Sequence, residues 1–328
     1  MSDLSTTYMG LKLPSPLVVA SSSISNKVEN FQSAEASGAG AIVLRSLFEE
    51  QIEAAETELQ EAIAFQADAN PEARSYLPPQ RIGPREYLRL LEKAKRAVRI
   101  PVIASLNAAA PGSWSEYAKQ LEDAGADAIE VNIYNVNAAI GVTGEEVERQ
   151  YLEIVRSVRR TVKVPVALKL SPFFTSFANV AKRFDDEGVN ALVLFNRFLQ
   201  PDIDLDRMAL NSSMQLSNPW EMLLPLRWTA ILHGRVKCDL AASTGVHDAA
   251  GVVKMLLAGS TVVQLAAALL RNGVTHLATL RSGLQEWMER GHFSAVDDFR
   301  GTLSQKEAKD PRAFERAQYV NLILSQNT

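Results

Sequence analysis

Five polar residues occupy the same kind of place in this sequence, because each closes a short apolar run. They are Arg45, Asn107, Asn132, Lys169 and Asn196. A cationic side chain there can balance negative charge on a ligand, and an amide can donate and accept hydrogen bonds along the edge of a heterocycle. If the ends of these runs meet in space, the pattern predicts a binding or catalytic site.

The runs must be strands of one sheet for that meeting to occur. Three of them, together with a further run that ends at Ala266, follow a glycine at nearly constant spacing. Glycine ends a helix because it adopts the left-handed conformation at little cost, so each strand begins at a fixed point. The four pairs of glycine and run-ending residue are Gly38 and Arg45, Gly125 and Asn132, Gly188 and Asn196, and Gly259 and Ala266.

Candidate strands alternate with helical patterns along the whole chain. They lie at 16–21, 41–45, 101–106, 127–132, 165–170, 191–196, 237–242 and 261–265, after a hairpin at 5–14. Almost wholly apolar strands that alternate with helices favour a parallel sheet covered by helices. The strand count predicts an α/β fold, a (β/α)8 TIM barrel, with its active site at the C-terminal face of the strands. Since no linker interrupts the pattern, we interpret residues 1–328 as a single domain.

Strand alternation also predicts which side chains enter the barrel. Ile129 and Val131 should point outward under the helices, and Glu130 should point inward. The same parity puts Ala167 and Lys169 inside. A buried ammonium is costly without a partner, so we expect a ligand or Glu130 to meet Lys169. A purely structural pair of Lys169 and Glu130 is the alternative.

Two connections exceed the usual length of strand-to-helix loops, at 46–100 and 197–217, and both are candidate lids over the site. An extra surface helix at 50–68 is an equally good interpretation of the first. Within it, the charge-rich pattern at 85–99 predicts a helix with a solvated outer face.

The loops after the last two strands have the position of the phosphate site in many barrels. Ser243, Thr244 and Gly245 follow the seventh strand, and Ala266 and Ala267 follow the eighth. Backbone N–H groups at helix starts attract anions, because these donors lack partners within the helix. An ordinary tight turn at Gly245 is the alternative.

Composition excludes several classes of function. The chain has 47% hydrophobic and 22% charged residues and a net charge of −4, which gives no general attraction for nucleic acid or anionic membranes. A single cysteine, Cys238, excludes an internal disulfide and multi-cysteine metal sites. Of the histidines only His247 lies near the predicted site, and we expect no metal and no nucleophilic triad. With no targeting segment or bilayer-spanning run, we expect a cytoplasmic protein.

In order along nearly the whole chain, these residues resemble the dihydroorotate dehydrogenase family, especially its soluble class 1 branch. VVASSS at 18–23 resembles the flavin-contacting turn, VNIYNVN at 131–137 the substrate-binding loop, and ALKLSP at 167–172 the strand with the flavin-contacting lysine. LFN at 194–196 resembles the segment of another substrate asparagine. With the strand-end pattern, this resemblance implies FMN contacts from Ala20, Ser21, Arg45, Asn107, Asn132, Lys169, Ser243, Thr244, Gly245, Ala266 and Ala267, and substrate contacts from Asn132, Asn137 and Asn196.

The chain departs from the family pattern at the catalytic base. Asn135 stands where class 1 members have a cysteine and the membrane-associated class has a serine, and an amide does not take a proton at neutral pH. Two residues could replace that base: Asn135 by orienting a proton-carrying water, or Tyr134 by contributing a phenol. The loop that grips the substrate carboxylate also differs, since residues 75–79 read SYLPP and proline removes backbone donors.

The resemblance implies an FMN-dependent oxidoreductase of pyrimidine metabolism that moves a hydride between flavin and a CH–CH bond of dihydroorotate or a related acid. Lys169, Arg45 and Asn135 are the candidate catalytic residues, the partner is a small molecule, and a homodimer is implied by the resemblance alone. One alternative is a non-redox barrel in which Lys169 forms a Schiff base with a phosphorylated carbonyl compound. Another is an FMN-binding protein without turnover of its own.

Overall fold

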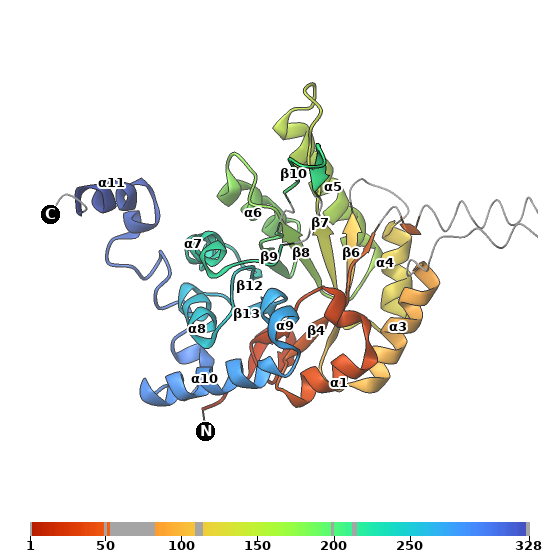
Figure 1. Cartoon of the computed structure of the whole chain (residues 1–328), viewed down its shortest axis with the longest axis horizontal. Coiled ribbons are helices and arrows are strands. Elements are labelled where there is room, and N and C mark those ends of the chain that lie inside the picture. The colour runs from red at the N-terminus through yellow and green to blue at the C-terminus, as the bar shows by residue number, and fades with distance from the viewer. Residues whose placement is uncertain are drawn as a thin grey trace, which may run out of the picture.

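The computed structural model describes residues 2–48, 51–52, 83–108, 114–197, 200–211 and 215–325. Eight parallel strands form a ring in which each pairs with the next, and the pairing of β4 with β6 completes it (Figure 1). The predicted (β/α)8 barrel is therefore confirmed. The barrel strands are β3 (Leu17–Val19), β4 (Ala41–Val43), β6 (Val102–Ala108), β7 (Ala128–Ile133), β8 (Val166–Leu170), β9 (Ala191–Leu194), β12 (Asp239–Ser243) and β13 (Val262–Leu265).

Helices cover the outside of the barrel in the order that the sequence pattern predicts. Helix α3 (Pro84–Ala97) confirms the helix predicted at 85–99 with slightly different ends, and its buried residues Tyr87, Leu91 and Ala94 form one stripe facing the strands. The other α-helices are α1 (Val28–Ala36), α4 (Trp114–Asp123), α5 (Gly144–Thr161), α6 (Phe177–Asp186), α7 (Leu223–Leu232), α8 (Ala249–Ala258), α9 (Ala267–Asn272), α10 (His276–Arg290) and α11 (Arg316–Ser325). Short 3₁₀ turns are η1 (Ser23–Asn26), η3 (Pro219–Met222), η4 (Val296–Asp298) and η5 (Pro311–Phe314).

The helix-ending glycines behave as predicted. Gly125 after α4 has φ +93°, and Gly259 after α8 has φ +111°. Gly38 and Gly188 also have positive φ. At Gly259 a side chain would meet a second obstacle, because a Cβ there would lie 2.3 Å from Cγ of His233. These turns fix where β4, β7, β9 and β13 begin, and so fix which residues reach the open end of the barrel.

The barrel interior is filled at one end and open at the other. The predicted N-terminal hairpin is present as β1 (Thr6–Tyr8) and β2 (Leu11–Leu13), and its Tyr8 and Leu13 are buried against small inward residues such as Ala128 and Ala167. Ile129 belongs instead to the outer core under the helices, as alternation predicts. Because the hairpin closes the N-terminal end, a ligand can enter the barrel only from the C-terminal ends of the strands.

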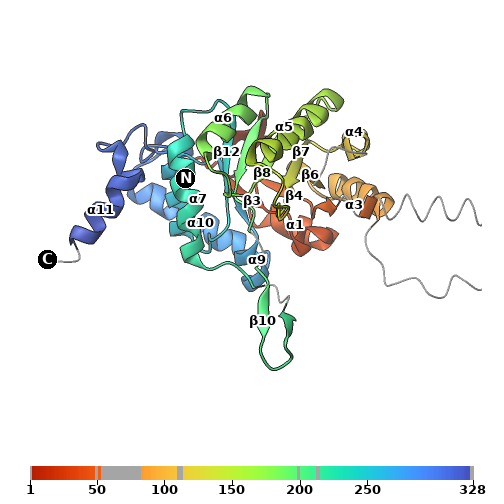
Figure 2. The same ribbon diagram turned by 90° about the horizontal axis from the view of Figure 1, so that it is seen from above.

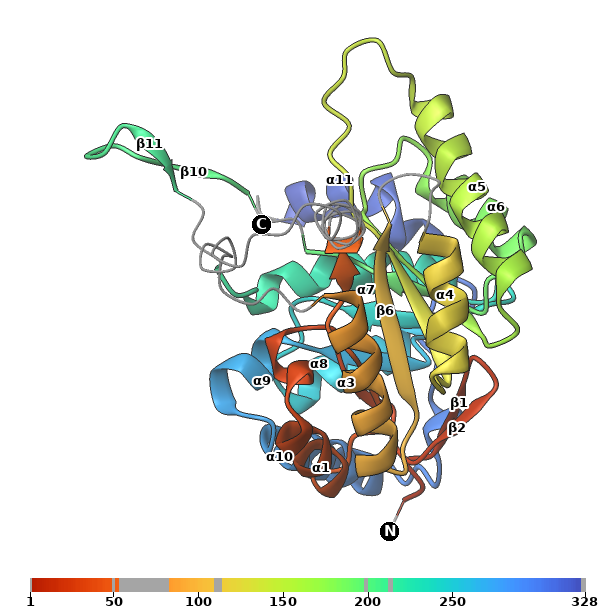
Figure 3. The same cartoon turned by 90° about the vertical axis from the view of Figure 1, so that its right-hand side faces the viewer.

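Three short strands were not foreseen from the sequence. Strand β5 (Leu47–Phe48) extends the edge of β6, and β10 (Asp202–Asp204) pairs with β11 (Ala209–Asn211) as an antiparallel hairpin. This hairpin projects from the barrel in Figures 2 and 3. Helix α11 lies away from the barrel in Figure 1. Among the described residues, no helix combines the length and hydrophobicity needed to cross a bilayer.

Candidate functional site

A cavity of about 530 Å³ lies at the C-terminal ends of the strands. Its wall brings together residues from nearly every barrel strand, and most of the predicted site residues are among them. The predicted residues that line it are Ser21, Arg45, Asn107, Asn132, Lys169, Asn196, Ser243, Thr244, Gly245, Ala266 and Ala267. These strand-end side chains therefore converge on one space, as the sequence pattern predicts.

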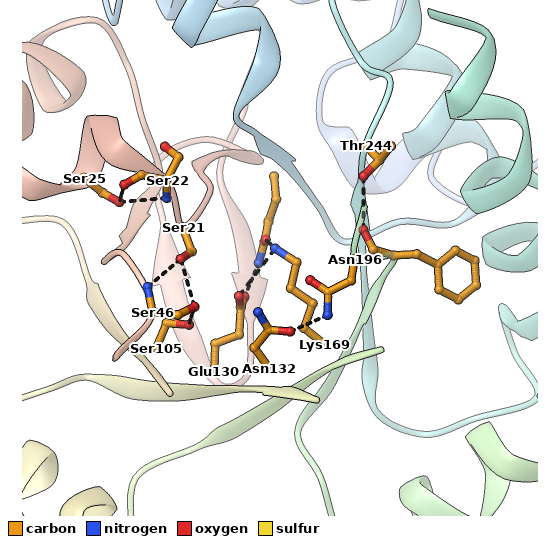
Figure 4. A network of polar contacts seen from close by, with 12 residues as sticks. Ser21, Ser22, Ser25, Ser46, Ser105, Glu130, Asn132, Lys169, Asn196 and Thr244 are labelled. Carbon is orange, nitrogen blue, oxygen red and sulfur yellow. Dashed lines mark hydrogen bonds and ion pairs between the residues drawn. The ribbon is translucent and has the colours of Figure 1, made fainter. Parts of the chain in front are cut away.

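The floor of this cavity is a buried cluster of Glu130, Lys169 and Gln264. Nζ of Lys169 lies 3.6 Å from Oε1 of Glu130 and donates to Oε1 of Gln264 at 3.3 Å. The Gln264 amide donates to Oε2 of Glu130 at 2.6 Å, which closes the cluster. Exposure is 1% for Glu130, 7% for Lys169 and 2% for Gln264. The ammonium therefore has a counterion from β7 and an orienting amide from β13, and its small exposed surface faces the cavity (Figure 4).

Two asparagines beside this cluster are joined to each other. The Asn196 amide donates to Oδ1 of Asn132, and it lies 3.4 Å from the backbone oxygen of Ile133 (Figure 4). Asn132 is on β7 and Asn196 follows β9, so their contact spans the end of the intervening strand. Their pairing fixes the orientation of both amides, and each keeps free capacity toward the cavity that it lines.

A chain of hydroxyl groups forms the opposite wall. The Oγ atoms of Ser21 and Ser46 lie 3.1 Å apart, and those of Ser46 and Ser105 lie 2.7 Å apart. The Tyr87 hydroxyl donates to the backbone oxygen of Ser105 at 3.1 Å, and burial raises the pKa of Tyr87. This wall is neutral and internally satisfied. Sequence reasoning missed both Ser46, which follows β4 and lines the cavity, and Ser105, which is buried within β6, although the place of Ser46 directly after Arg45 was a usable signal.

The two predicted phosphate loops border the same cavity. Thr244 has φ +81° and donates through Oγ1 to the backbone oxygen of Phe195 at 3.1 Å. Gly245 has φ +79°, and a Cβ there would lie 2.2 Å from the backbone nitrogen of Met222. Gly245 therefore does form a tight turn against η3, as the alternative interpretation has it. Ala266 and Ala267 line the cavity at the start of α9, where the first N–H groups have no partner within the helix.

Positive charge at the mouth comes from Arg45. This side chain is exposed, lines the cavity, and has no hydrogen bond or ion pair with any other described residue. The Lys169 charge is matched by Glu130, so the charge balance favours an anionic ligand. His247 does not line the cavity. Its Nε2 lies 3.3 Å from Oγ of Ser217, and burial together with the nearby Arg271 lowers its pKa.

Three predicted residues lie outside the cavity wall. Asn135 and Asn137 are on the loop after β7, where Asn135 donates to Asn137 at 3.3 Å and Asn137 to the Tyr151 hydroxyl at 3.1 Å. Tyr134, on the same loop, does line the cavity. Ala20 is buried behind the wall, and its N–H donates to the backbone oxygen of Leu265 at 3.0 Å.

Other residues singled out from the sequence lie away from the cavity or outside the described residues. Cys238 precedes β12 at the closed end of the barrel, where burial raises the pKa of its thiol. The SYLPP loop at 75–79, the candidate helix at 50–68 and parts of both predicted lids lie outside the described residues. Within the described part of the chain, no three histidine, cysteine or acidic side chains gather in a way that could hold a metal ion.

Comparison with known proteins agrees with this arrangement. The sequence model of the family described as dihydroorotate dehydrogenase matches residues 80–288, more than half of the chain. The chain belongs to the dihydroorotate dehydrogenase family. It is 28% identical over 225 residues to the putative dihydroorotate dehydrogenase A (fumarate) of Aeropyrum pernix, a match that covers 67% of this chain and 72% of that one.

Other members of the dihydroorotate dehydrogenase family match over more of the chain. The catalytic subunit of dihydroorotate dehydrogenase B (NAD(+)) from Thermoplasma volcanium is 26% identical over 314 residues, which is 93% of this chain and 100% of the relative. The subunit of the same name from Geotalea uraniireducens is 27% identical over 316 residues, or 92% and 98% of the two chains. The names of these relatives give different oxidants, so membership of the family does not by itself identify the oxidant.

Proposed function

We propose that this protein is an FMN-dependent oxidoreductase that moves a hydride between the flavin and a CH–CH bond of dihydroorotate or a related dihydropyrimidine-like acid. The observation that carries the proposal is the buried Lys169, held by Glu130 and Gln264 at the floor of a cavity that is bordered by the two loops predicted to bind phosphate. Membership of a family whose named relatives are dehydrogenases of dihydroorotate supports it.

The residues present fit FMN. The cavity of about 530 Å³ is within the range of roughly 300–1,000 Å³ typical of sites for ligands of this size. Small side chains at Ala266 and Ala267 leave the first N–H groups of α9 accessible from the cavity. These donors, with the turn at Thr244 and Gly245, would hold the phosphate, and Ser21, Asn107 and Lys169 would face the ring.

When bound, the flavin would supply the hydride acceptor. Lys169 would hold positive charge beside the ring and so balance the negative charge that reduction adds there. Asn132 and Asn196, fixed by their mutual hydrogen bond, would orient the substrate through their remaining donors and acceptors. Arg45 would attract the acidic group of the substrate at the mouth of the cavity.

Oxidation of a CH–CH bond also requires a group that takes a proton. Tyr134 lines the cavity and Asn135 does not, so within this proposal the Tyr134 hydroxyl relays the proton, accepting it from the substrate as it passes its own proton to water. Asn135 would act at most on water in the loop after β7, where its amide already donates to Asn137. The homodimer implied by the family resemblance and the cytoplasmic location expected from the sequence both stay predictions.

The visible absorption spectrum of the purified protein, before and after FMN is supplied, tests the cofactor. Anaerobic addition of dihydroorotate then tests the reaction, because hydride transfer bleaches the flavin bands. A colourless protein that takes up no FMN would refute the proposal. Bands that persist with dihydroorotate and with related dihydro acids would instead indicate an FMN-binding protein without this turnover.

A Schiff-base enzyme remains the alternative because Lys169 reaches the cavity beside an anion site. Its ion pair with Glu130 disfavours this function, since attack on a carbonyl requires the neutral amine. Borohydride trapping with phosphorylated aldehydes distinguishes the two functions. A covalent adduct on Lys169 would support the alternative, and its absence across these aldehydes would remove it.

A further inference from the structure

A second cavity, of about 600 Å³, opens beside the first. The two share Asn196, Arg197, Gln215 and Thr244 in their walls, so they adjoin at these residues. Asn196 is also a proposed substrate contact. A ligand held at this residue can therefore extend into the second cavity without leaving the site.

The two cavities differ in chemistry. Both walls mix polar and apolar side chains, but the second differs in holding the aromatic residues Phe173, Phe195 and Trp220 together with Leu224. Trp220 is 80% exposed, Phe173 69% and Leu224 45%. Large apolar side chains left in water around one hollow are typical of a binding site.

The backbone that presents Trp220 is firmly held. Its N–H donates to Oδ1 of Asn218 at 3.0 Å, and the N–H of Asn218 donates to the carboxylate of Glu221 at 2.7 Å. The other oxygen of that carboxylate pairs with Nε of Arg197 at 2.8 Å. Trp220 is thus the exposed aromatic face of a capped turn, anchored to the residue that follows Asn196, and little ordering is needed when a ligand binds to it.

We propose that the second cavity receives an aromatic or other planar apolar group carried by the substrate, whose reacting part lies at Asn132 and Asn196. This inference rests on the proposed function, because FMN in the first cavity leaves the second as the space for a substrate. The substrate class is then an acid larger than dihydroorotate, with an apolar ring beyond its CH–CH bond. A small molecule fits better than a protein partner because this surface is a hollow that shares Asn196 with the barrel site.

Isothermal titration calorimetry with crotonate and cinnamate tests the inference. Both are unsaturated acids of the kind that CH–CH oxidation produces, and they differ in a methyl against a phenyl group. We expect cinnamate to bind about tenfold more tightly, because the phenyl group buries more apolar surface. Trp220→Ala should remove most of this advantage, and Phe173→Ala should reduce it by about threefold. Tyr319→Ala removes an aromatic ring of 66% exposure from α11 and should change nothing.

Equal affinities of the native protein for the two acids would overturn the inference, as would an unchanged preference in both Trp220→Ala and Phe173→Ala. A Trp220→Ala variant that dissociates an oligomer while keeping the preference for cinnamate would assign Trp220 to a subunit interface instead. Calorimetry measures binding of the acids whether or not flavin is bound, whereas the absorption spectrum measures FMN uptake. A failure of the proposed function and a failure of this inference are therefore distinguishable.

Discussion

The floor of the cavity and the loop after β7 were both predicted to carry catalytic residues, and the structure gives them opposite surroundings. Glu130, Lys169 and Gln264 come from three strands and are at most 7% exposed. Asn135 is half-buried and Asn137 exposed, and both belong to one loop in which they bond to each other. The first group is positioned by the barrel itself, whereas the second is held by a hydrogen bond within the loop and by one from Asn137 to Tyr151 of α5.

This difference indicates where the chemistry of the site is fixed. A charge pair on barrel strands keeps its geometry as long as the barrel exists, and any change in it leaves a buried group without a partner. A loop amide near water can be replaced by water. Substitutions on the floor should therefore be costly to folding and cofactor binding, and substitutions on the loop should act on catalysis or on nothing.

The largest effect is expected from Lys169→Met. It leaves the Glu130 carboxylate buried without its cation, which should lower the free energy of unfolding by about 3–5 kcal/mol and abolish tight FMN binding. Urea denaturation and the flavin content of the purified protein measure the two effects. Lys182→Met, which removes a lysine of 47% side-chain exposure from α6, serves as the control.

The double variant Lys169→Met with Glu130→Gln separates charge from packing. It removes both members of the pair, so most of the lost stability should return while flavin binding stays impaired. A single Lys169→Met variant with native stability and native flavin content would show that the buried pair of Lys169 and Glu130 supports neither folding nor FMN binding.

Tyr134→Phe should produce the next largest effect, on catalysis alone. If its hydroxyl relays the proton to water, its loss should slow flavin reduction about 10²-fold with the acid that bleaches the native flavin bands. FMN content should not change, because the variant removes one oxygen from a half-buried loop residue and keeps its ring. Stopped-flow absorbance measures the rate, and an unchanged rate would exclude Tyr134 as the proton-transfer group.

Glu130→Gln should have a smaller effect of a different kind. Glutamine preserves the shape and one acceptor for Gln264, so we expect a loss of about 1–3 kcal/mol in stability. The Lys169 ammonium then lacks its counterion, which should shift the midpoint potential of bound flavin to a more positive value, because negative charge on the reduced ring is better balanced. Glu145→Gln removes the same charge at the exposed start of α5 and should leave the potential unchanged.

The strands were predictable because the residue at which each begins, and the alternation of its inward and outward side chains, depend on the local sequence. Gly125 and Gly259 end helices by their own conformational freedom, and the parity of Ile129 against Glu130 follows from the strand alone. The convergence of strand-end residues on one cavity then follows from the closure of the barrel. The hairpin of β10 and β11 gave no comparable signal, since it projects from the barrel and its strands have only three residues each.

The contacts within the site were less predictable, because they depend on neighbours in space. The pairing of Lys169 with Glu130 was foreseen as an alternative to a ligand, but Gln264 lies 95 positions away from Lys169 along the chain. The position of Asn135 was inferred from a resemblance between loops, and a loop does not fix the direction of a side chain as a strand does. Whether Asn135 takes part in catalysis stays a prediction.

Asn135→Ala and Asn137→Ala should have the smallest effects. Each removes a hydrogen bond made near water, so the free energy of unfolding should change by about 0.5 kcal/mol or less, and the flavin reduction rate by about threefold at most. Asn137→Ala also frees the Tyr151 hydroxyl, so of the two it should cost more stability. A fall of a hundredfold or more in the reduction rate of Asn135→Ala, with flavin content unchanged, would contradict the small role expected of this loop. It would mean that the loop closes over the bound substrate and that Asn135 acts in the place held by the base in the related enzymes.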